Sequence, residues 1–207
     1  MSIAKTHRAR RPGARGPRDR RRTSRIRPQV QALESRELLS FTTLLWSQGV
    51  SLPAPRGGPA ALVSGGSIIV AGGKTSGSAT AVNSLAPTAS SWGTLRNLNS
   101  GRVGPGFVAM PSGLLLVYGG GGGSSGTTSL SSAFLYSPSG QESNDTNSMQ
   151  TGRRQFAWAP DGSSQAYAIG GVSGQATNLA TVERYNPTTG LWSTVASLLP
   201  MSRWISG

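Results

Sequence analysis

The stretch from Arg102 to Gly120, RVGPGFVAMPSGLLLVYGG, contains an arginine, two apolar runs and a closing pair of glycines. The apolar runs cover 106–110 and 114–118, with a Pro-Ser-Gly turn between them. Short apolar runs joined by such a turn are typical of two antiparallel strands. The second run is continuous rather than alternating, which is typical of a strand covered on both faces. This stretch therefore predicts the first half of a buried β-sheet.

The same order of markers recurs along the chain at a period of about 50 residues. Successive arginines are separated by 46, 51 and 50 residues, and successive glycine pairs by 47 and 51. A leucine or tyrosine with proline two positions later follows each glycine pair, and in three places a tryptophan precedes the next arginine by 10 or 11 residues. The markers are Arg56, Arg102, Arg153 and Arg203; Gly72-Gly73, Gly119-Gly120 and Gly170-Gly171; Leu85, Tyr136 and Tyr185; and Trp46, Trp92 and Trp192. A fixed order at a fixed period predicts a repeat protein.

Each unit is interpreted as four short strands. In the second copy a Gly/Ser loop over 119–128 is followed by a third strand over 130–136 and a further turn at 138–140. We predict three complete units, which cover 56–101, 102–152 and 153–202. The preceding residues 46–55 add the last strand of an earlier unit, and residues 203–207 begin another. No segment shows sustained helical periodicity, so the expected fold class is all-β.

The order of arginine, apolar strand, Gly-Gly, aromatic residue with a following proline, and tryptophan resembles the kelch repeat over about 160 residues. The resemblance implies four-stranded blades of a β-propeller. It also implies that the arginines hold each blade by hydrogen bonds, while the large tryptophans are expected to pack between neighbouring blades. The second copy departs from the pattern with Ser143 in place of tryptophan, and the first with Leu85 in place of the aromatic residue.

The number of units is small for this architecture, because propellers normally close with about 4–8 blades. An open array leaves two blade faces bare. If each exposed about 400 Å² of apolar surface, the loss would be on the order of 10 kcal/mol per face at about 25 cal/mol per Å². That rivals the stability of a typical domain. We therefore expect an incomplete ring, either a fragment of a longer protein or a chain that needs a partner. Alone, it should be marginal and self-associating.

Residues 1–40 differ in composition from residues 41–207. Residues 1–27 hold eleven Lys and Arg against one Asp, which is +10 of the net charge of +13. Dense like charges with little apolar surface predict a disordered basic tail. Two interpretations stay open for this tail. It is either an electrostatic arm for nucleic acid or another polyanion, or a targeting or processing segment that is basic.

A short motif follows the basic run. It resembles the LEPR-XLL segment of large bacterial surface and exported proteins, with Ser35 in place of its proline; the matching residues are Leu33, Glu34, Arg36, Leu38 and Leu39. The resemblance implies sorting toward the cell envelope or the outside, and a cytoplasmic location is the alternative. No stretch approaches the roughly 20 apolar residues that span a bilayer, so no transmembrane segment is expected.

The residue inventory excludes several kinds of catalytic and metal site. The chain has no cysteine, and its single histidine, His7, lies in the tail. Thiolate zinc sites, cysteine nucleophiles and, within the repeats, histidine-based triads are therefore excluded. Kelch-type propellers include copper radical oxidases resembling galactose oxidase, but these need a Cys–Tyr cross-link and histidine ligands. The acids of the repeats are widely separated in sequence: Glu142, Asp145, Asp161 and Glu183. A glycosidase pair of carboxylates is not indicated by that spacing.

Two glycine-rich motifs invite a nucleotide-binding interpretation. Residues 121–126 match the G-x-G-x-x-G spacing, but the sequence that follows favours strand and loop rather than the helix that a dinucleotide site requires. The run Gly72-Gly73-Lys74-Thr75 resembles the end of a phosphate-binding loop, yet Ile68 stands where that loop requires glycine. We interpret both as blade loops, and no cofactor is predicted.

The sequence therefore predicts a non-catalytic scaffold that binds protein or carbohydrate partners. The long loops 73–83, 120–129 and 171–178 are the expected contact regions, and their Gly, Ser and Thr residues offer hydrogen bonds without large anchors. Two alternative functions remain. One is polyanion or nucleic-acid binding through residues 5–27. The other is a non-catalytic part of a galactose-oxidase-like enzyme whose chemistry is supplied by further blades.

Overall fold

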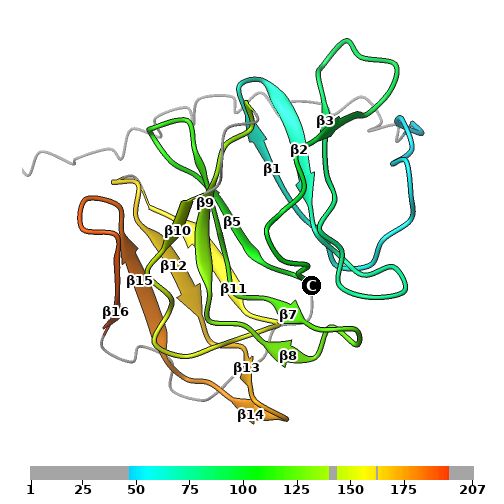
Figure 1. Ribbon diagram of the computed structural model, residues 1–207. Helices are drawn as coiled ribbons and strands as arrows, with labels where there is room; N and C mark the ends of the chain where they lie inside the picture. The colour runs from blue at the N-terminus through cyan, green and yellow to red at the C-terminus, as the bar shows by residue number, and fades with distance from the viewer. Residues whose placement is uncertain (1–46, 140–143, 162, 196–207) are drawn as a thin grey trace, which may run out of the picture. The chain divides into compact units, whose positions relative to one another are not determined.

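The computed structural model describes residues 47–139, 144–161 and 163–195, which all belong to one compact unit (Figure 1). Every helix or strand assigned in these residues is a β-strand, so the predicted all-β class is confirmed. The basic tail, the LEPR-XLL-like segment, Trp46, Ser143 and Arg203 lie outside the described residues.

The first blade is a four-stranded antiparallel sheet with strands in the order β1-β2-β3-β4. Its strands are β1 (Ala60–Ser64), β2 (Ser67–Ala71), β3 (Val82–Leu85) and β4 (Gly93–Leu95). A tight turn at Gly65 and Gly66 joins β1 to β2, and both residues have positive φ angles, 57° and 77°. Glycine adopts this left-handed backbone without a steric penalty, which explains the turn.

The second and third blades repeat this arrangement. The second sheet has the order β10-β9-β6-β5 and the third β11-β12-β15-β16. The second contains β5 (Gly106–Ala109), β6 (Leu115–Tyr118), β9 (Ala133–Tyr136) and β10 (Asn144–Thr146). The third contains β11 (Ala157–Pro160), β12 (Ala166–Ile169), β15 (Val182–Asn186) and β16 (Leu191–Val195). Three four-stranded blades are therefore present, as the repeat predicted.

Two of the predicted loops contain structure of their own. Strand β7 (Gly121–Gly122) pairs with β8 (Thr128–Ser129), and β13 (Val172–Ser173) pairs with β14 (Thr177–Asn178). The third strand of the second blade also begins later than predicted, at Ala133 rather than at residue 130. The reason is that the backbone of Leu130 donates to Gly120 O at 3.0 Å and so belongs to the loop.

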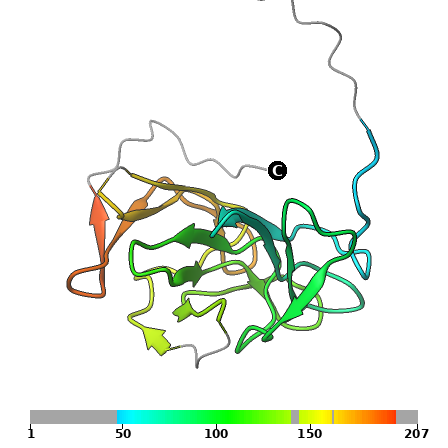
Figure 2. The ribbon, with the colours of Figure 1, turned by 90° about the horizontal axis from the view of Figure 1, so that it is seen from above.

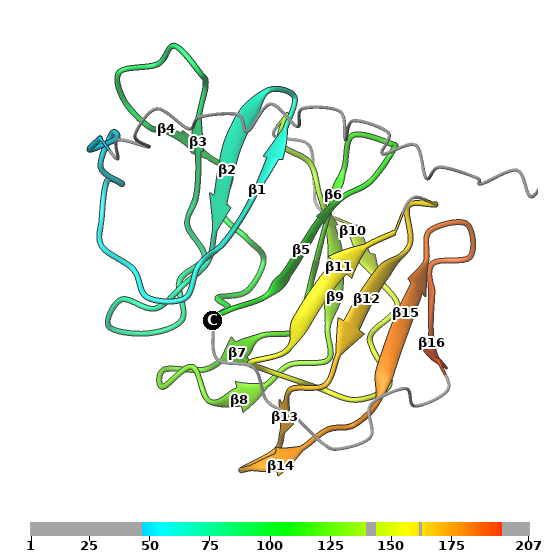
Figure 3. The same cartoon turned by 180° about the vertical axis from the view of Figure 1, so that it is seen from behind.

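The first strands of the three blades lie side by side. Strand β5 contacts both β1 and β11, and Figure 3 shows these three strands next to one another. The chain order of the blades, from cyan through green to orange, can also be followed from above in Figure 2. The described blades leave the ring open, so the second blade is the only one of them with a described neighbour on each side.

The core consists of two clusters, one at each blade junction. Phe107, Leu115 and Val117 of the second blade pack toward the first blade. Leu116 and Tyr118, which alternate with them along β6, pack toward the third. All five of these side chains are fully buried. The continuous apolar run therefore forms a strand covered on both faces, as its pattern indicated.

Candidate functional site

A buried or half-buried arginine holds each blade at an equivalent place. Each one donates from Nη1 to the carbonyl of the first glycine in its pair and to a second carbonyl just before the third strand of the blade. The acceptors are Gly72 and Ala81 for Arg56 at 3.4 and 3.1 Å, Gly119 and Ser132 for Arg102 at 3.0 and 2.8 Å, and Gly170 and Thr181 for Arg153 at 2.8 and 3.1 Å. Each arginine therefore gives the carbonyl of the first glycine a donor, and it adds a second hydrogen bond to a carbonyl that already accepts one from the N–H of that same glycine.

The other end of each guanidinium meets a different residue type at one repeat position. Arg56 donates to Asn83 Oδ1 at 2.7 Å, and Arg153 forms an ion pair with Glu183 at 2.5 Å. The corresponding residue in the second blade is an aromatic ring, which lies 4.7 Å from the guanidinium carbon of its arginine. Glu183 also accepts hydrogen bonds from two backbone N–H groups at 2.6 and 3.0 Å. Glu183 is therefore committed to the structure of its blade.

The glycine pairs join one blade to the next. Gly73 N donates to Arg102 O at 2.7 Å, and Gly120 N donates to Arg153 O at 2.9 Å. A Cβ atom on Gly72 would lie 2.5 Å from Arg102 O, so only glycine permits this approach. Gly119, Gly170 and Gly171 share the positive φ of the other pair members.

The aromatic markers lie at the blade junctions where a neighbour is present. The Tyr136 hydroxyl donates to Arg96 O of the first blade at 2.7 Å, and the Tyr185 hydroxyl lies 3.0 Å from Thr146 Oγ1 of the second. The ring of Trp192 packs 4.9 Å from that of Tyr118, centroid to centroid. Trp92 is only half-buried, and its Nε1 donates to Val50 O at 2.9 Å.

We call the edge that carries the predicted contact loops the loop rim, and its loops are cross-linked between blades. Ser78 Oγ donates to Gly123 O at 2.8 Å, and Ser129 Oγ donates to Val172 O at 3.0 Å. Arg154 donates to Thr127 O at 2.9 Å and, from another nitrogen, to Gln175 O at 3.0 Å. The three loops are therefore held in a fixed relation to one another, which is a favourable starting point for binding.

A groove of about 380 Å³ lies on the loop rim between the first and second blades. It is lined by Gly77, Ser78, Ser100, Gly101, Gly122, Gly123, Ser124 and Leu130. The lining combines serine hydroxyls and glycine backbone with a single leucine, and it contains no titratable side chain. Such a surface exchanges neutral hydrogen bonds with a ligand and supplies no acid, base or nucleophile pair.

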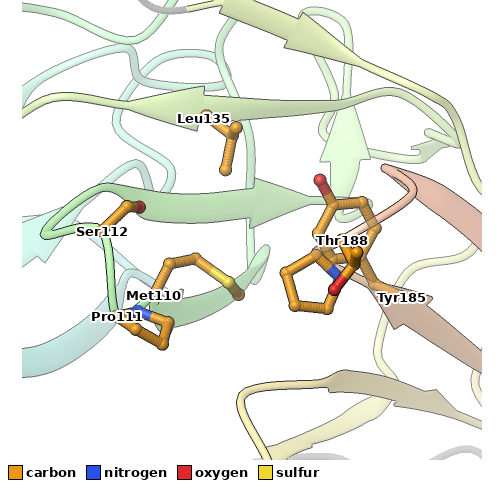
Figure 4. A pocket seen from close by; sticks show the side chains of 7 residues that line it. Met110, Pro111, Ser112, Leu135, Tyr185 and Thr188 are labelled. Atoms are coloured by element: carbon orange, nitrogen blue, oxygen red, sulfur yellow. The ribbon is translucent and has the colours of Figure 1, made fainter.

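The opposite edge, which we call the turn rim, carries two clefts that sequence reasoning missed. One, of about 250 Å³, lies between the second and third blades (Figure 4) and is lined by Met110, Pro111, Ser112, Leu135, Tyr185, Pro187 and Thr188. The other, of about 490 Å³, is lined by Ser64, Gly65, Ile69, Ser112, Gly113, Leu114, Ser137, Pro138 and Ser139. Each cleft uses the proline two residues after a marker tyrosine. That Tyr-x-Pro signal was available in the sequence.

Asp161 shapes the turn between β11 and β12. Its Oδ1 accepts hydrogen bonds from the backbone of Ser163 and Gln165, both at 2.9 Å, and its Oδ2 accepts one from the Tyr167 hydroxyl at 3.2 Å. Desolvation alone would raise the pKa of Asp161, but these hydrogen bonds together lower the pKa below its ordinary value of 3.8. This carboxylate is thus a turn residue that stays ionised.

The remaining candidate groups do not converge on a reactive site. Glu142 and the side chain of Asp145 lie outside what the structure describes. In the described ranges there is no group of three or more His, Cys, Asp or Glu residues that could hold a metal ion. Lys74 is exposed and pairs through its backbone with Gly57. The G-x-G-x-x-G run enters strand β7 rather than a helix, which removes the basis for a dinucleotide site.

Four-stranded blades packed side by side through their first strands define a β-propeller type of architecture. Residues 164–199 match the Kelch motif family. The solved structure of YjhT is similar at a TM-score of 0.60 and 17% identity, over 72% of this chain and 54% of that chain. The chain therefore spans about half the length of YjhT, and the likeness shows the fold alone. No curated protein matches the sequence. Among the described residues no helix is long and apolar enough to cross a bilayer.

Proposed function

We propose that this chain is a non-catalytic binding scaffold that recognises an extended segment of a protein partner in the groove on its loop rim. The observation that carries the proposal is the groove itself, about 380 Å³ in volume, between loops that hydrogen bonds already tie together. Because these loops are fixed before binding, less conformational entropy is lost when a partner binds.

The chemistry of the groove favours a polypeptide over a charged or aromatic small molecule. Its lining presents backbone groups and small hydroxyls, including exposed Ser124. An extended peptide exchanges main-chain hydrogen bonds with such a surface, while Leu130 contacts one of its apolar side chains. A carbohydrate is the second ligand class that neutral hydrogen bonds would suit, and the experiment below separates the two.

The acids of the described repeats support a function without catalysis. Glu183 is only 1% exposed and is paired with Arg153. Asp161 is held by its own turn, on the opposite edge from the groove. Neither carboxylate faces the groove lining, so neither is available there as a general acid or base.

Export is part of the same proposal. It is supported by the LEPR-XLL-like residues, among them Leu33, Arg36 and Leu39, which match an export-associated segment. Binding of polyanions by the basic tail remains the rival function. Fusing residues 1–46 to a reporter should direct export in a bacterium that carries such proteins, and a reporter retained in the cytoplasm would argue against it.

The groove is tested by filling it. Purified full chain is screened against a displayed library of linear peptides and, in parallel, against a carbohydrate array. The Ser124→Trp variant places a large side chain in the groove and should weaken peptide binding by about tenfold or more, since main-chain contacts are blocked. Thr88→Trp, at an exposed turn of the first blade, is the matched control and should bind normally.

Three results would overturn this function. Peptide binding that survives Ser124→Trp would place the site elsewhere. Selective binding to the carbohydrate array, lost in the same variant, would replace the polypeptide with a glycan. Binding that disappears when residues 1–40 are deleted would transfer the function to the tail, where it should also fall steeply with salt.

A further inference from the structure

The two clefts of the turn rim lie at equivalent places of successive blade junctions, yet their chemistry differs. Each is lined by the proline that follows a marker tyrosine. Met110 and Leu135 line the cleft between the second and third blades. The same repeat positions of the first blade hold Ser64 and Ser84. The hollow therefore follows from the fold, whereas an apolar lining is particular to one of the two described junctions.

We name the hollow between the second and third blades the apolar cleft, and its walls are held in place by the core. Met110 and Tyr185 both belong to the buried cluster of this junction. The Tyr185 hydroxyl lies 3.0 Å from Thr146 Oγ1, which fixes the ring. Figure 4 shows Met110 and Leu135 of the second blade across the cleft from Tyr185 of the third. Both walls belong to described blades, so the cleft is formed before any partner binds.

The size and lining of the apolar cleft limit what it can hold. Its volume of about 250 Å³ is below the roughly 300–1,000 Å³ of sites that enclose drug-sized ligands. Among its lining residues, the hydroxyls on the exposed edge are those of Ser112 and Thr188. A carbohydrate would need more hydrogen-bonding groups than this, whereas an aliphatic or aromatic side chain gains from leaving water. The cleft therefore suits one large apolar side chain.

An ionised carboxylate lies on the same rim, in the turn between β11 and β12. Pro160 pairs with Ala166, which pairs in turn with Tyr185 of the cleft. Asp161 directly follows this row, and two strand spacings of about 4.8 Å place its turn about 10 Å from Tyr185. At the first junction the corresponding turn of the second blade, residues 112–114, forms part of the cleft wall. The turn of Asp161 therefore lies beside the apolar cleft.

The carboxylate of Asp161 can accept a further donor. Its Oδ1 is used within the turn, and among the described residues its Oδ2 accepts one hydrogen bond, from the Tyr167 hydroxyl at 3.2 Å. A carboxylate oxygen can accept about two. Arg184, next to Tyr185 along β15, does not oppose a cation here, because successive side chains of a strand point to opposite faces of the sheet. Charge complementarity therefore favours a lysine or arginine of the partner.

We propose that the apolar cleft is a second binding site, which takes one apolar side chain of a protein partner while a lysine or arginine of the same segment pairs with Asp161. A gap of about 10 Å equals roughly three residues of extended chain, so the basic residue should stand about two or three positions from the apolar one. The site is on the opposite rim from the loop-rim groove and does not depend on the function proposed above.

The first experiment selects displayed linear peptides on the purified full chain and retests the bound clones on two variants. Thr188→Trp fills the apolar cleft from an exposed turn and should weaken cleft-specific clones by about tenfold or more. Thr88→Trp, at the same repeat position of the first blade, is the matched control and should bind them normally. These clones should share an apolar residue with Lys or Arg at the spacing given above.

The outcomes separate the two rims. Clones that are lost only in Ser124→Trp belong to the loop-rim groove. If no clone is sensitive to Thr188→Trp, with the variant folded by circular dichroism, the second site does not exist. Self-association of the purified chain that Thr188→Trp abolishes would replace the protein partner with a second copy of this chain.

A second variant keeps the cleft open but changes its chemistry. Leu135→Ser introduces the residue type that the first blade carries at this position, Ser84, so the backbone accommodates it. The selected peptides should bind about tenfold more weakly, because their apolar side chain loses its contact. Leu130→Ser, which removes another half-buried leucine on the loop rim, is the control and should leave them bound. Undiminished binding to Leu135→Ser would contradict an apolar anchor in the cleft.

The charge is tested with a pair of synthetic peptides, one selected sequence and the same sequence with glutamine in place of its basic residue. The glutamine peptide should bind the parent chain about two- to fivefold more weakly, since an exposed ion pair contributes little. On Asp161→Asn the two peptides should bind alike. Because the ratio is measured on one protein, a change in the stability of the turn cancels. A preference for the basic peptide that persists in Asp161→Asn would show that another group recognises the cation.

Discussion

Gln155 occupies a backbone position where the other two blades have glycine. Its φ angle is 52°, close to the 57° of both Gly58 and Gly104, which stand two residues after their marker arginines. A left-handed backbone costs a residue with a Cβ atom about 1 kcal/mol or more relative to glycine. The third blade therefore holds a strained residue on the loop rim, beside Arg154, which donates to the Gln155 Oε1 atom at 3.0 Å.

Replacing this glutamine should relieve the strain. We expect Gln155→Gly to raise the free energy of unfolding by about 0.5–1 kcal/mol, because glycine adopts a positive φ without steric strain. The hydrogen bond from Arg154 to the glutamine side chain is lost, but it is exposed and contributes little. The reciprocal variant Gly104→Gln is the control. A Cβ atom there would meet nothing within 4 Å, so its expected loss of about 1 kcal/mol is purely conformational. Urea unfolding measures both, and a destabilised Gln155→Gly would refute the strain argument.

The sequence predicted the positions of the marker arginines but not all of their hydrogen-bond partners. The period located Arg56, Arg102 and Arg153, and the resemblance implied hydrogen bonding by them. Their second partners were not foreseen, because one repeat position holds Asn83, Phe134 and Glu183. An amide, a ring and a carboxylate share no sequence pattern, although each one stabilises a guanidinium by a different physical interaction.

The hairpin of β11 and β12 is the element whose stability should depend most directly on pH. Its turn is organised by the ionised carboxylate of Asp161, whose pKa is lowered in the fold. A group with a lowered folded pKa contributes stability that is fully present above its unfolded value, here 3.8, and is lost as the pH falls through the folded value. The hairpin contribution should therefore be complete at neutral pH and decline in the acid range below 3.8.

Asp161→Asn removes this dependence, since the amide keeps the shape of the side chain without the charge. We expect the variant to be less stable than the parent chain at pH 7, with the difference shrinking as acid protonates the parent carboxylate. Urea midpoints of both chains at a series of pH values provide the measurement. A difference that stays constant across the acid range would show that the charge has no part in holding the turn.

At the element scale the sequence predicted strands well and loop structure poorly. Four-residue apolar runs such as Leu115–Tyr118 have enough length to give a signal. The ladders β7–β8 and β13–β14 have two residues per strand, so no periodicity is visible. The loop-rim groove was foreseen only as loops, and the turn-rim clefts were missed, because both kinds of hollow depend on how neighbouring blades approach.

At the scale of the whole molecule, the burial of a repeat position depends on whether its blade has a neighbouring blade on that side. Trp92 and Trp192 fill the same repeat position, yet Trp192 is buried against the second blade, with 6% of its surface exposed, while Trp92 is only half-buried. The expectation that tryptophans pack between blades therefore describes Trp192. No described blade precedes the first blade. The local sequence around Trp92 does not show whether a neighbouring blade covers its ring, so the difference in burial between the two tryptophans could not be predicted.

The two tryptophans provide a matched pair of variants. Trp192→Ala should lower the free energy of unfolding by about 3–5 kcal/mol, because it empties a buried site beside Tyr118 and Tyr185. Trp92→Ala should cost only about 1 kcal/mol, because it removes a half-buried ring and one hydrogen bond to Val50. Urea unfolding of both variants beside the parent chain provides the measurement. Equal losses at the two sites would show that both rings are packed alike.

The arginine clamps and glycine joints also bear on how such a chain changes in length over evolution. Arg153 finds Gly170, Thr181 and Glu183 within its own repeat, so the side-chain partners travel with the unit when it is copied or deleted. The hydrogen bond from each glycine pair to the next unit uses main-chain atoms, as between Gly120 N and Arg153 O, and any copy supplies these atoms. Gain or loss of a whole repeat therefore preserves both kinds of hydrogen bond, and only the side-chain packing at the new junction has to adapt.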